Sequence, residues 1–198
     1  MTAIQTTHFS LRKPKNNTRR EREHLTEHEV EKLMRAAKQM GRHGHRDSTM
    51  ILVAYRHGLR VSELVRLKWM QVDLFQGLLH VTRSKHGVSS THPLAGVELR
   101  ALRKLQRDYP LTDFLFVSER KAPLTDHTFR KLLTRAGAEA KLKLNVHPHM
   151  LRHATGFKLA NEGHDTRSIQ HYLGHRNIQN TMRYTELDAN RFNEFWTD

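Results

Sequence analysis

The stretch HPHMLRH, residues 147–153, places three histidines around a single arginine. Side chains of these types could build either of two sites, a metal site with imidazole ligands or an anion site around the guanidinium. His149 and His153 are four residues apart, as are His171 and His175, so each pair could share one face of a helix. Because histidine pairs at this spacing can bind zinc, the spacing alone leaves both kinds of site open.

The arginine favours the anion site. A catalytic zinc site usually has a third protein ligand, and HPHMLRH lacks the glutamate of the HExxH metalloprotease pattern. Arg152 lies three residues after His149 and projects to the same side, where its permanent positive charge disfavours a dication. A guanidinium offers a planar fork of donors that matches a phosphate, and imidazoles donate or transfer protons. We therefore predict an oxyanion site without metal, although capping or packing would explain any one of these histidines alone.

The charge of the chain agrees with a polyanionic partner. Its 198 residues suit one domain, and 34 Lys and Arg residues against 20 Asp and Glu residues give a formal net charge of +14. This excess favours nucleic acid, although a well-solvated surface would also explain it. No apolar run approaches the roughly 18 residues that span a membrane, and the chain has no cysteine for disulfides or zinc. We expect a cytoplasmic, nucleoid-associated protein.

Residues 1–23 are polar and basic and contain few large apolar side chains. Such a segment cannot bury enough apolar surface to offset the entropy cost of ordering, so we interpret it as a flexible arm that precedes one domain over residues 24–198. The arm could lie along a phosphate backbone, with Arg19 and Arg20 as candidates for contact with DNA. A solubilising tail or an expression remnant would explain the composition nearly as well.

Helices dominate the elements that must position these residues. Thr26 and Glu29 form a capping box ahead of apolar residues at helical spacing. Further helices are predicted from about Asp47 to Gly58, from near Ser62, at about 95–108 and 125–140, and through the last third of the chain, with breaks at Gly163, at Gly174 and after Tyr184.

Two segments have the character of strands. Alternating residues on either side of Lys85, His86 and Gly87 predict a hairpin, and FLFVS, residues 114–118, predicts a further short strand. The sequence thus predicts a mainly α-helical α+β domain with one small antiparallel sheet.

Residues suited to phosphate chemistry follow one another along the chain. They are Arg60 in GLRVSEL, Lys85 at the hairpin tip, His149 and Arg152 in HPHMLRHATG, His175 in YLGHRN and Tyr184 in MRYT. In this order they resemble the signature of the tyrosine recombinases, the phage integrase family, over essentially all of residues 24–198. The stretches YRHGLRVSEL and HPHMLRHATG look closest to the short fimbrial phase-variation recombinases, which lack the N-terminal core-binding domain of larger members. The resemblance implies the catalytic-domain fold of that family.

The resemblance also implies how the site would work on DNA. Tyr184 would attack a phosphate and form a 3′-phosphotyrosyl link, while Arg60 and Arg152 would hold the non-bridging oxygens. Glu63, three residues after Arg60, matches an acidic partner that orients this arginine. The covalent link would store the energy of the phosphodiester, so neither metal nor nucleotide cofactor is expected.

Proton transfer is implied at three further positions. Lys85 would protonate the leaving 5′ oxygen, His149 would act as general base toward the tyrosine, and His175 would hydrogen-bond a non-bridging oxygen. Lys68 and Arg83 are the alternatives to Lys85 in this role. His153 is interpreted as a supporting or simply packing residue, and the tyrosines at positions 55, 109 and 172 as core or interface residues.

The partners implied are double-stranded DNA and further copies of the chain. In DHTFRKLLTRAG, Arg130, Lys131 and Arg135 could face DNA, although a solvated charged face is about as plausible. The resemblance implies a homotetramer assembled on DNA, and an accessory DNA-bending protein could assist it. A C-terminal tail could pass to a neighbouring subunit or pack against its own domain, with contacts from Phe192, Phe195 and Trp196.

The resulting prediction is a site-specific recombinase that inverts, integrates or excises a DNA segment. A type IB topoisomerase, which uses a similar set of residues without a partner site, is a second enzyme to consider. A DNA-binding regulator that keeps the fold without catalysis is a third hypothesis, and its mark would be an incomplete set of site residues. The set in this sequence is complete.

Overall fold

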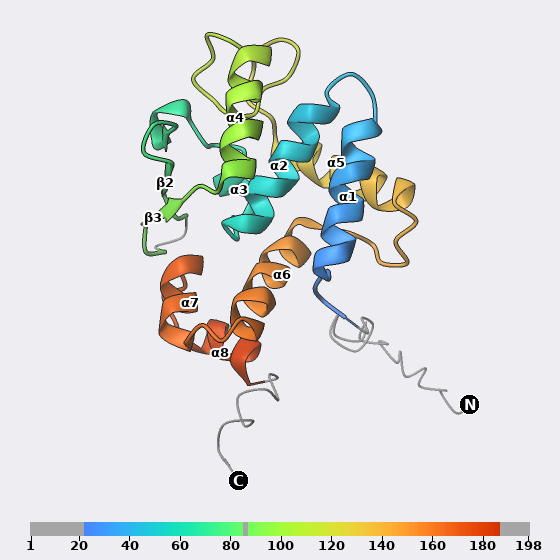
Figure 1. Cartoon of the computed structure of the whole chain (residues 1–198). Coiled ribbons are helices and arrows are strands. Elements are labelled where there is room, and N and C mark those ends of the chain that lie inside the picture. The colour runs from blue at the N-terminus through green and yellow to red at the C-terminus, as the bar shows by residue number, and fades with distance from the viewer. Residues whose placement is uncertain (1–21, 85–86, 187–198) are drawn as a thin grey trace, which may run out of the picture.

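The computed structural model describes residues 22–84 and 87–186. Its elements follow the order α1 (Glu27–Gln39), α2 (Gly44–Arg56), α3 (Val61–Leu64), η2 (Trp69–Gln71), β1 (Val72–Asp73), β2 (Leu78–Val81), β3 (Ser90–Pro93), α4 (Gly96–Asp108), α5 (Asp126–Glu139), α6 (Pro148–Asn161), α7 (Thr166–Leu173) and α8 (Gln179–Thr185). The prediction of a mainly helical α+β domain with a small antiparallel sheet is confirmed (Figure 1).

Helices α1 and α2 begin the domain and pack against each other (Figure 1). The predicted capping box starts α1, since the Glu29 amide donates to Thr26 Oγ1 at 3.3 Å and the Thr26 amide donates to Glu29 Oε2 at 2.8 Å. Helix α2 begins at Gly44, three residues before the predicted Asp47. A Cβ atom at Gly44 would lie 1.9 Å from the Lys38 carbonyl oxygen, so a tight turn between the two helices lets α2 start early.

The sheet has the strand order β1-β2-β3, and both pairings are antiparallel. Leu79 of β2 lies opposite His92 of β3, so the predicted hairpin is present, with residues 85–86 outside the described part. The prediction of a strand at 114–118 is wrong. That segment forms only isolated bridges, between Lys68 and Phe114 and between Val117 and Pro123. Leu115, Phe116 and Val117 are all buried, so this short apolar run belongs to the core.

Helix α2 crosses the centre of the domain and buries Met50, Ile51 and Val53. Helix α6 packs beside it and leads to α7 and α8, which lie at the far end of α6 (Figure 1). A second, smaller apolar cluster joins these last helices through Ala160, Leu173 and Tyr184. Side chains from α2, α6, α7 and α8 therefore converge where the main core meets this cluster.

Two glycines shape that junction. Gly58, just after α2, has φ +55°, and Gly174, just after α7, has φ +65°. These left-handed conformations turn the chain sharply into Arg60 and His175 respectively, as the sequence predicted for both breaks. Helix α8 runs through Tyr184 and ends at Thr185, one residue later than predicted. In the described ranges, no helix combines the length and the apolar character needed to cross a membrane.

We predict that Gly58→Ala destabilises the protein more than Gly41→Ala does. Both positions have positive φ, but a Cβ at Gly58 would lie 2.4 Å from Leu173 Cδ2, whereas nothing lies within 4 Å of one at Gly41. We expect Gly41→Ala to lower the free energy of unfolding by about 1–2 kcal/mol. Gly58→Ala should cost about 1–3 kcal/mol more through overpacking. Urea titration measures both, and equal losses would contradict the packing argument.

Candidate active site

Arg60 and Glu63 form a pair across the first turn of α3. Arg60 is the residue before the helix, and its side chain is 23% exposed, whereas that of Glu63 is 1% exposed. Arg60 Nη1 donates to Glu63 Oε1 at 2.7 Å, and the Arg60 amide donates to Glu63 Oε2 at 2.9 Å. The carboxylate therefore holds both the backbone and the guanidinium of Arg60, the geometry expected of an orienting partner.

Helix α6 brings His149 and Arg152 to the same place. Pro148 starts this helix with a fixed φ, His149 is exposed in the first turn, and Arg152 is buried one turn further on. The Arg152 guanidinium donates to the Gly58 carbonyl and, at 2.8 Å, to the Leu173 carbonyl. Among the described residues, no carboxylate forms an ion pair with Arg152. Its positive charge is thus held by neutral carbonyls.

A cavity of about 250 Å³ lies between these side chains, and Arg60, His149 and Arg152 all line it. Arg130 of α5 lines the same cavity, as does Asp126. Two guanidiniums from α3 and α6 and an imidazole therefore converge on one space that can hold a phosphate group. Tyr184 does not line this cavity in the described structure.

The charges around the cavity are unbalanced. Burial, and after it the charges of Arg60 and Arg83, lowers the pKa of Arg152 to about 9, although the charge of Glu63 opposes this shift. Although burial alone would raise the pKa of Glu63, amide hydrogen bonds and the charge of Arg83 bring it to about 2. Four guanidiniums, those of Arg60, Arg83, Arg130 and Arg152, thus lie in or beside the cavity with two carboxylates, those of Glu63 and Asp126. Bringing like charges together in a partly desolvated site is unfavourable, and a bound oxyanion would relieve it.

His175 stands directly after the left-handed turn at Gly174 and is buried. Its Nδ1 lies 2.8 Å from Thr181 Oγ1, and its ring is stacked with that of Tyr184 at 6.4 Å between centroids. Burial lowers the pKa of His175 to about 3, assisted by the charges of Arg152 and Arg60. The imidazole is therefore neutral at neutral pH and can donate a hydrogen bond from Nε2 if Nδ1 accepts from the Thr181 hydroxyl.

Tyr184 lies in a slot against α6. It is 2% exposed, its ring meets that of Phe157 edge to face at 5.2 Å, and a Cβ at Gly156 would lie 2.6 Å from its ring. Its hydroxyl lies 2.9 Å from Nδ1 of His153. Burial raises the pKa of Tyr184, although the charge of Arg152 opposes this shift. The tyrosine is therefore protonated and sequestered in this arrangement.

His153 contacts the hydroxyl of Tyr184, whereas the sequence predicts only a supporting or packing role for this histidine. It stacks on His149 one helical turn earlier, at 5.7 Å between ring centroids. Burial, with the charge of Arg183 as the next cause, lowers the pKa of His153 to about 3, so the imidazole is neutral and can accept a hydrogen bond from the hydroxyl. A spacing of four residues predicts that His153 shares a helix face with His149. No pattern in the sequence predicts that Tyr184 contacts this face.

Lys68 and Arg83, the alternatives to Lys85, each have other contacts. Lys68 Nζ lies 5.2 Å from the centroid of the Phe114 ring. Arg83 is buried and donates to Glu63 Oε2 at 3.0 Å. Lys85 itself lies outside the described residues, so its role stays a prediction.

The structure describes only some of the residues predicted to bind DNA. Arg130, Lys131 and Arg135 are all exposed on α5. Arg130 and Arg135 point about 140° apart around the helix axis, so they do not share one face. Arg135 instead contributes to the electrostatic surroundings of Asp47 at the start of α2. The arm and tail residues Arg19, Arg20, Phe192, Phe195 and Trp196 lie outside the described part.

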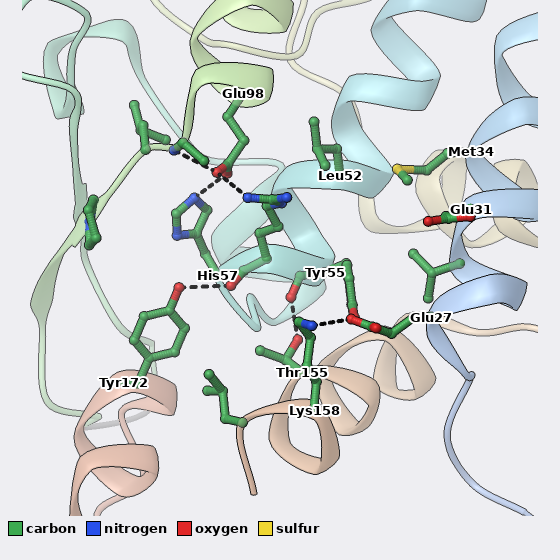
Figure 2. A pocket seen from close by; sticks show the side chains of 16 residues that line it. Glu27, Glu31, Met34, Leu52, Tyr55, His57, Glu98, Thr155, Lys158 and Tyr172 are labelled. Atoms are coloured by element: carbon green, nitrogen blue, oxygen red, sulfur yellow. Dashed lines mark hydrogen bonds and ion pairs between the residues drawn. The ribbon is translucent and has the colours of Figure 1, made fainter. Parts of the chain in front are cut away.

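A second cavity, of about 480 Å³, is lined by residues of α1, α2, α4, α6 and α7, and none of the predicted site residues that the structure describes lines it (Figure 2). His57 Nε2 lies 2.8 Å from Glu98 Oε1 there, and the Tyr172 hydroxyl donates to the Arg56 carbonyl at 2.8 Å. Figure 2 shows these contacts beside the apolar side chains of Met34 and Leu52. They tie the C-terminal end of α2 to α4 and α7. Across the described ranges, no group of three or more His, Asp or Glu residues is placed to hold a metal ion.

The depressed histidine pKa values predict a loss of stability in acid. His153 and His175 have pKa values of about 3 in the folded state, against about 6.5 when unfolded. Between these values the unfolded chain binds more protons, so stability is present above about pH 6.5 and falls as the pH decreases. We expect the free energy of unfolding in urea to drop from about pH 7 to about pH 5, with a smaller drop in His175→Gln. Equal stability of the wild-type protein at both pH values would contradict the account.

Comparison with known proteins shows the family of the chain. The model of the phage integrase family matches residues 23–191. The type 1 fimbriae regulatory protein FimB of Escherichia coli (strain K12) is 41% identical over 182 residues, which cover 89% of this chain and 90% of FimB. FimE of the same strain is 42% identical over 181 residues, which cover 88% of this chain and 91% of FimE.

A solved structure shows the same fold. The crystal structure of the XerH site-specific recombinase bound to palindromic difH substrate, a post-cleavage complex, matches with a TM-score of 0.72 and 25% identity. The match covers 87% of this chain and 52% of that chain, so this chain spans about half the length of XerH. The chain therefore belongs to the phage integrase family and is a tyrosine recombinase.

Proposed function

We propose that this protein binds a specific site on double-stranded DNA and cuts and rejoins it through a covalent link to Tyr184, so as to invert, integrate or excise a DNA segment. The observation that carries the proposal is the cavity between Arg60, His149 and Arg152, where guanidinium charge exceeds carboxylate charge. The relatives support it, since XerH is a site-specific recombinase solved with its DNA substrate.

The phosphate clamp would consist of Arg60 and Arg152. Each guanidinium would donate to a non-bridging oxygen of the scissile phosphate, and His175 would donate to the same group. Negative charge on these oxygens grows in the pentacoordinate transition state, so donors already fixed in place lower the barrier. Glu63 and the carbonyls of Gly58 and Leu173 hold the two arginines before DNA arrives.

The chemical step would form one bond and break another. Tyr184 Oη would attack phosphorus, the bond from phosphorus to the 5′ oxygen would break, and the tyrosine proton would pass to a base. Lys85 would give a proton to the leaving 5′ oxygen. Attack of a 5′ hydroxyl on the phosphotyrosyl link would reverse the step and rejoin the strand, so the reaction needs no nucleotide.

His149 and His153 would divide the handling of the tyrosine. His149 lines the phosphate cavity, whereas Tyr184 does not line it and its hydroxyl contacts His153 instead. The tyrosine must therefore move toward the cavity before it can attack. We assign His153 to holding the hydroxyl at rest and His149 to accepting the proton during attack.

Assembly on DNA is proposed as a homotetramer. Its subunits would exchange the tail that carries Phe192, Phe195 and Trp196, and an accessory DNA-bending protein could assist. Basic residues of the arm and of α5, including Arg19, Arg20, Arg130, Lys131 and Arg135, would contact the DNA backbone or grooves.

The covalent intermediate gives the direct test. Tagged protein is recovered under denaturing conditions from cells that carry its native DNA, and attached DNA is sequenced. We expect DNA from one site to be recovered with the wild-type protein and none with Tyr184→Phe, because the variant keeps the ring and lacks the nucleophile. Absence of adduct in both would leave the binding-only regulator as the better function.

A second assay, with purified protein and supercoiled DNA that carries one or two copies of the recovered site, separates the two enzyme classes. Cleavage and rejoining that depend on a paired site identify a recombinase. Relaxation of supercoiled DNA with no partner site would instead indicate a topoisomerase of type IB.

The assignment of the two histidines predicts unequal effects on cleavage. We expect His149→Gln to lower the rate of adduct formation by about 100-fold, as loss of a general base does. His153→Gln should lower it by less than about 10-fold, because it removes a contact of the resting state. Rates on a short duplex under single-turnover conditions measure both. A larger loss in His153→Gln would assign the base to His153.

A further inference from the structure

Arg83 occupies the junction between the elements that carry the site. It follows β2, and its side chain is completely buried. Its Nη1 donates to Glu63 Oε2 at 3.0 Å, and its Nη2 donates to the His57 carbonyl at 3.2 Å and to the Tyr172 carbonyl. One guanidinium thus reaches α3, the C-terminal end of α2 and the C-terminal end of α7.

Each of these contacts lies next to a residue of the proposed phosphate site. Glu63 holds Arg60. The His57 carbonyl precedes that of Gly58, which accepts from Arg152 and, at 3.5 Å, from Arg83. Tyr172 precedes Leu173, whose carbonyl also accepts from Arg152. Arg83 therefore binds the same short segments that fix both arginines of the clamp.

Packing around Arg83 also fixes the position of His175. A Cβ atom at Gly174 would lie 2.6 Å from Arg83 Cγ, so only glycine lets the turn before His175 rest on this side chain. The Tyr172 hydroxyl also links α7 to the C-terminal end of α2, because it donates to the Arg56 carbonyl at 2.8 Å (Figure 2). The turn that presents His175 is thus supported by the stem of Arg83.

We propose that Arg83 is a positioning residue, which sets Arg60, Arg152 and His175 around the scissile phosphate without touching it. This inference rests on the proposed DNA cleavage. No other residue type supplies the contacts, because the planar guanidinium places two nitrogens on acceptors from three elements at once. A lysine offers one nitrogen and cannot bridge Glu63 and the Tyr172 carbonyl together.

The test compares two DNA duplexes that differ at the scissile group, a normal phosphate and a neutral methylphosphonate. A clamp of arginines stabilises the charge on the non-bridging oxygens, so a misplaced clamp harms reaction of the charged group more than that of the neutral one. We expect Arg83→Met to slow adduct formation on phosphate by about 100-fold and on methylphosphonate by about 10-fold or less. Arg83→Lys should shift the ratio in the same direction, and it serves if Arg83→Met does not fold.

Two controls separate positioning from stability. Arg46 is also buried, and its Nη1 donates to the Val117 carbonyl at 2.9 Å, but it makes no contact with the site residues described above. Arg46→Met should destabilise the protein and leave the ratio of the two rates at its wild-type value. Arg60→Met, which removes a clamp residue directly, should change the ratio as Arg83→Met does.

The outcomes distinguish the inference from the function on which it rests. If the wild-type protein cleaves neither duplex, the proposed function fails. If Arg60→Met changes the ratio but both Arg83 variants slow the two reactions equally, Arg83 is only structural and the inference is wrong. A shifted ratio in Arg83→Met or Arg83→Lys, with an unshifted ratio in Arg46→Met, supports positioning.

Discussion

The rest of the site depends on one buried carboxylate, that of Glu63. It accepts from the guanidinium and amide of Arg60, from the guanidinium of Arg83, and from the amide and hydroxyl of Ser84. A buried carboxylate is tolerated only when its oxygens are satisfied, and this one is satisfied from α3 and from the segment after β2 together. Loss of Glu63 would leave two guanidiniums without a counter-charge, so both the hairpin and the clamp would lose their common anchor.

The remaining positive charge favours an oxyanion as the ligand of the cavity. Arg152 is held by carbonyls that supply no charge, and the guanidiniums of Arg152, Arg60 and Arg83 add to burial in lowering the pKa of His175. Meanwhile Tyr184 is protonated in a slot outside the cavity, with its hydroxyl against His153. The two features favour an order of events, because a phosphate would balance the charge first and the tyrosine would then move to attack. Burial until that moment would keep the proposed nucleophile from attacking other phosphates.

Local patterns predicted most of the elements, and contacts distant in sequence account for what was missed. The pair of Arg60 and Glu63 follows from a spacing of three residues, and the turns at Gly58 and Gly174 follow from glycines at helix ends. The short apolar run at 114–118 predicts a strand wrongly, because a buried core segment and a buried strand have the same composition. The partners of His153 and Arg83 lie 31 and 89 residues away at Tyr184 and Tyr172, which no local pattern could reveal. Buried polar atoms are normally hydrogen-bonded. Among the described residues, the buried side-chain nitrogen without a hydrogen-bond partner is Arg83 Nε, which lies at the junction of the elements that carry the site.

The central claim is that the site is electrostatically incomplete until a phosphate enters, and the pKa of His175 reports this most directly. Histidine resonances of Tyr184→Phe can be titrated by NMR in complex with its DNA site, once with a normal scissile phosphate and once with a neutral methylphosphonate at that position alone. The account predicts a higher pKa for His175 with the charged phosphate, rising by about one unit or more from its low value in the free protein, because the phosphate offsets the arginine charges. Equal pKa values in the two complexes would contradict it.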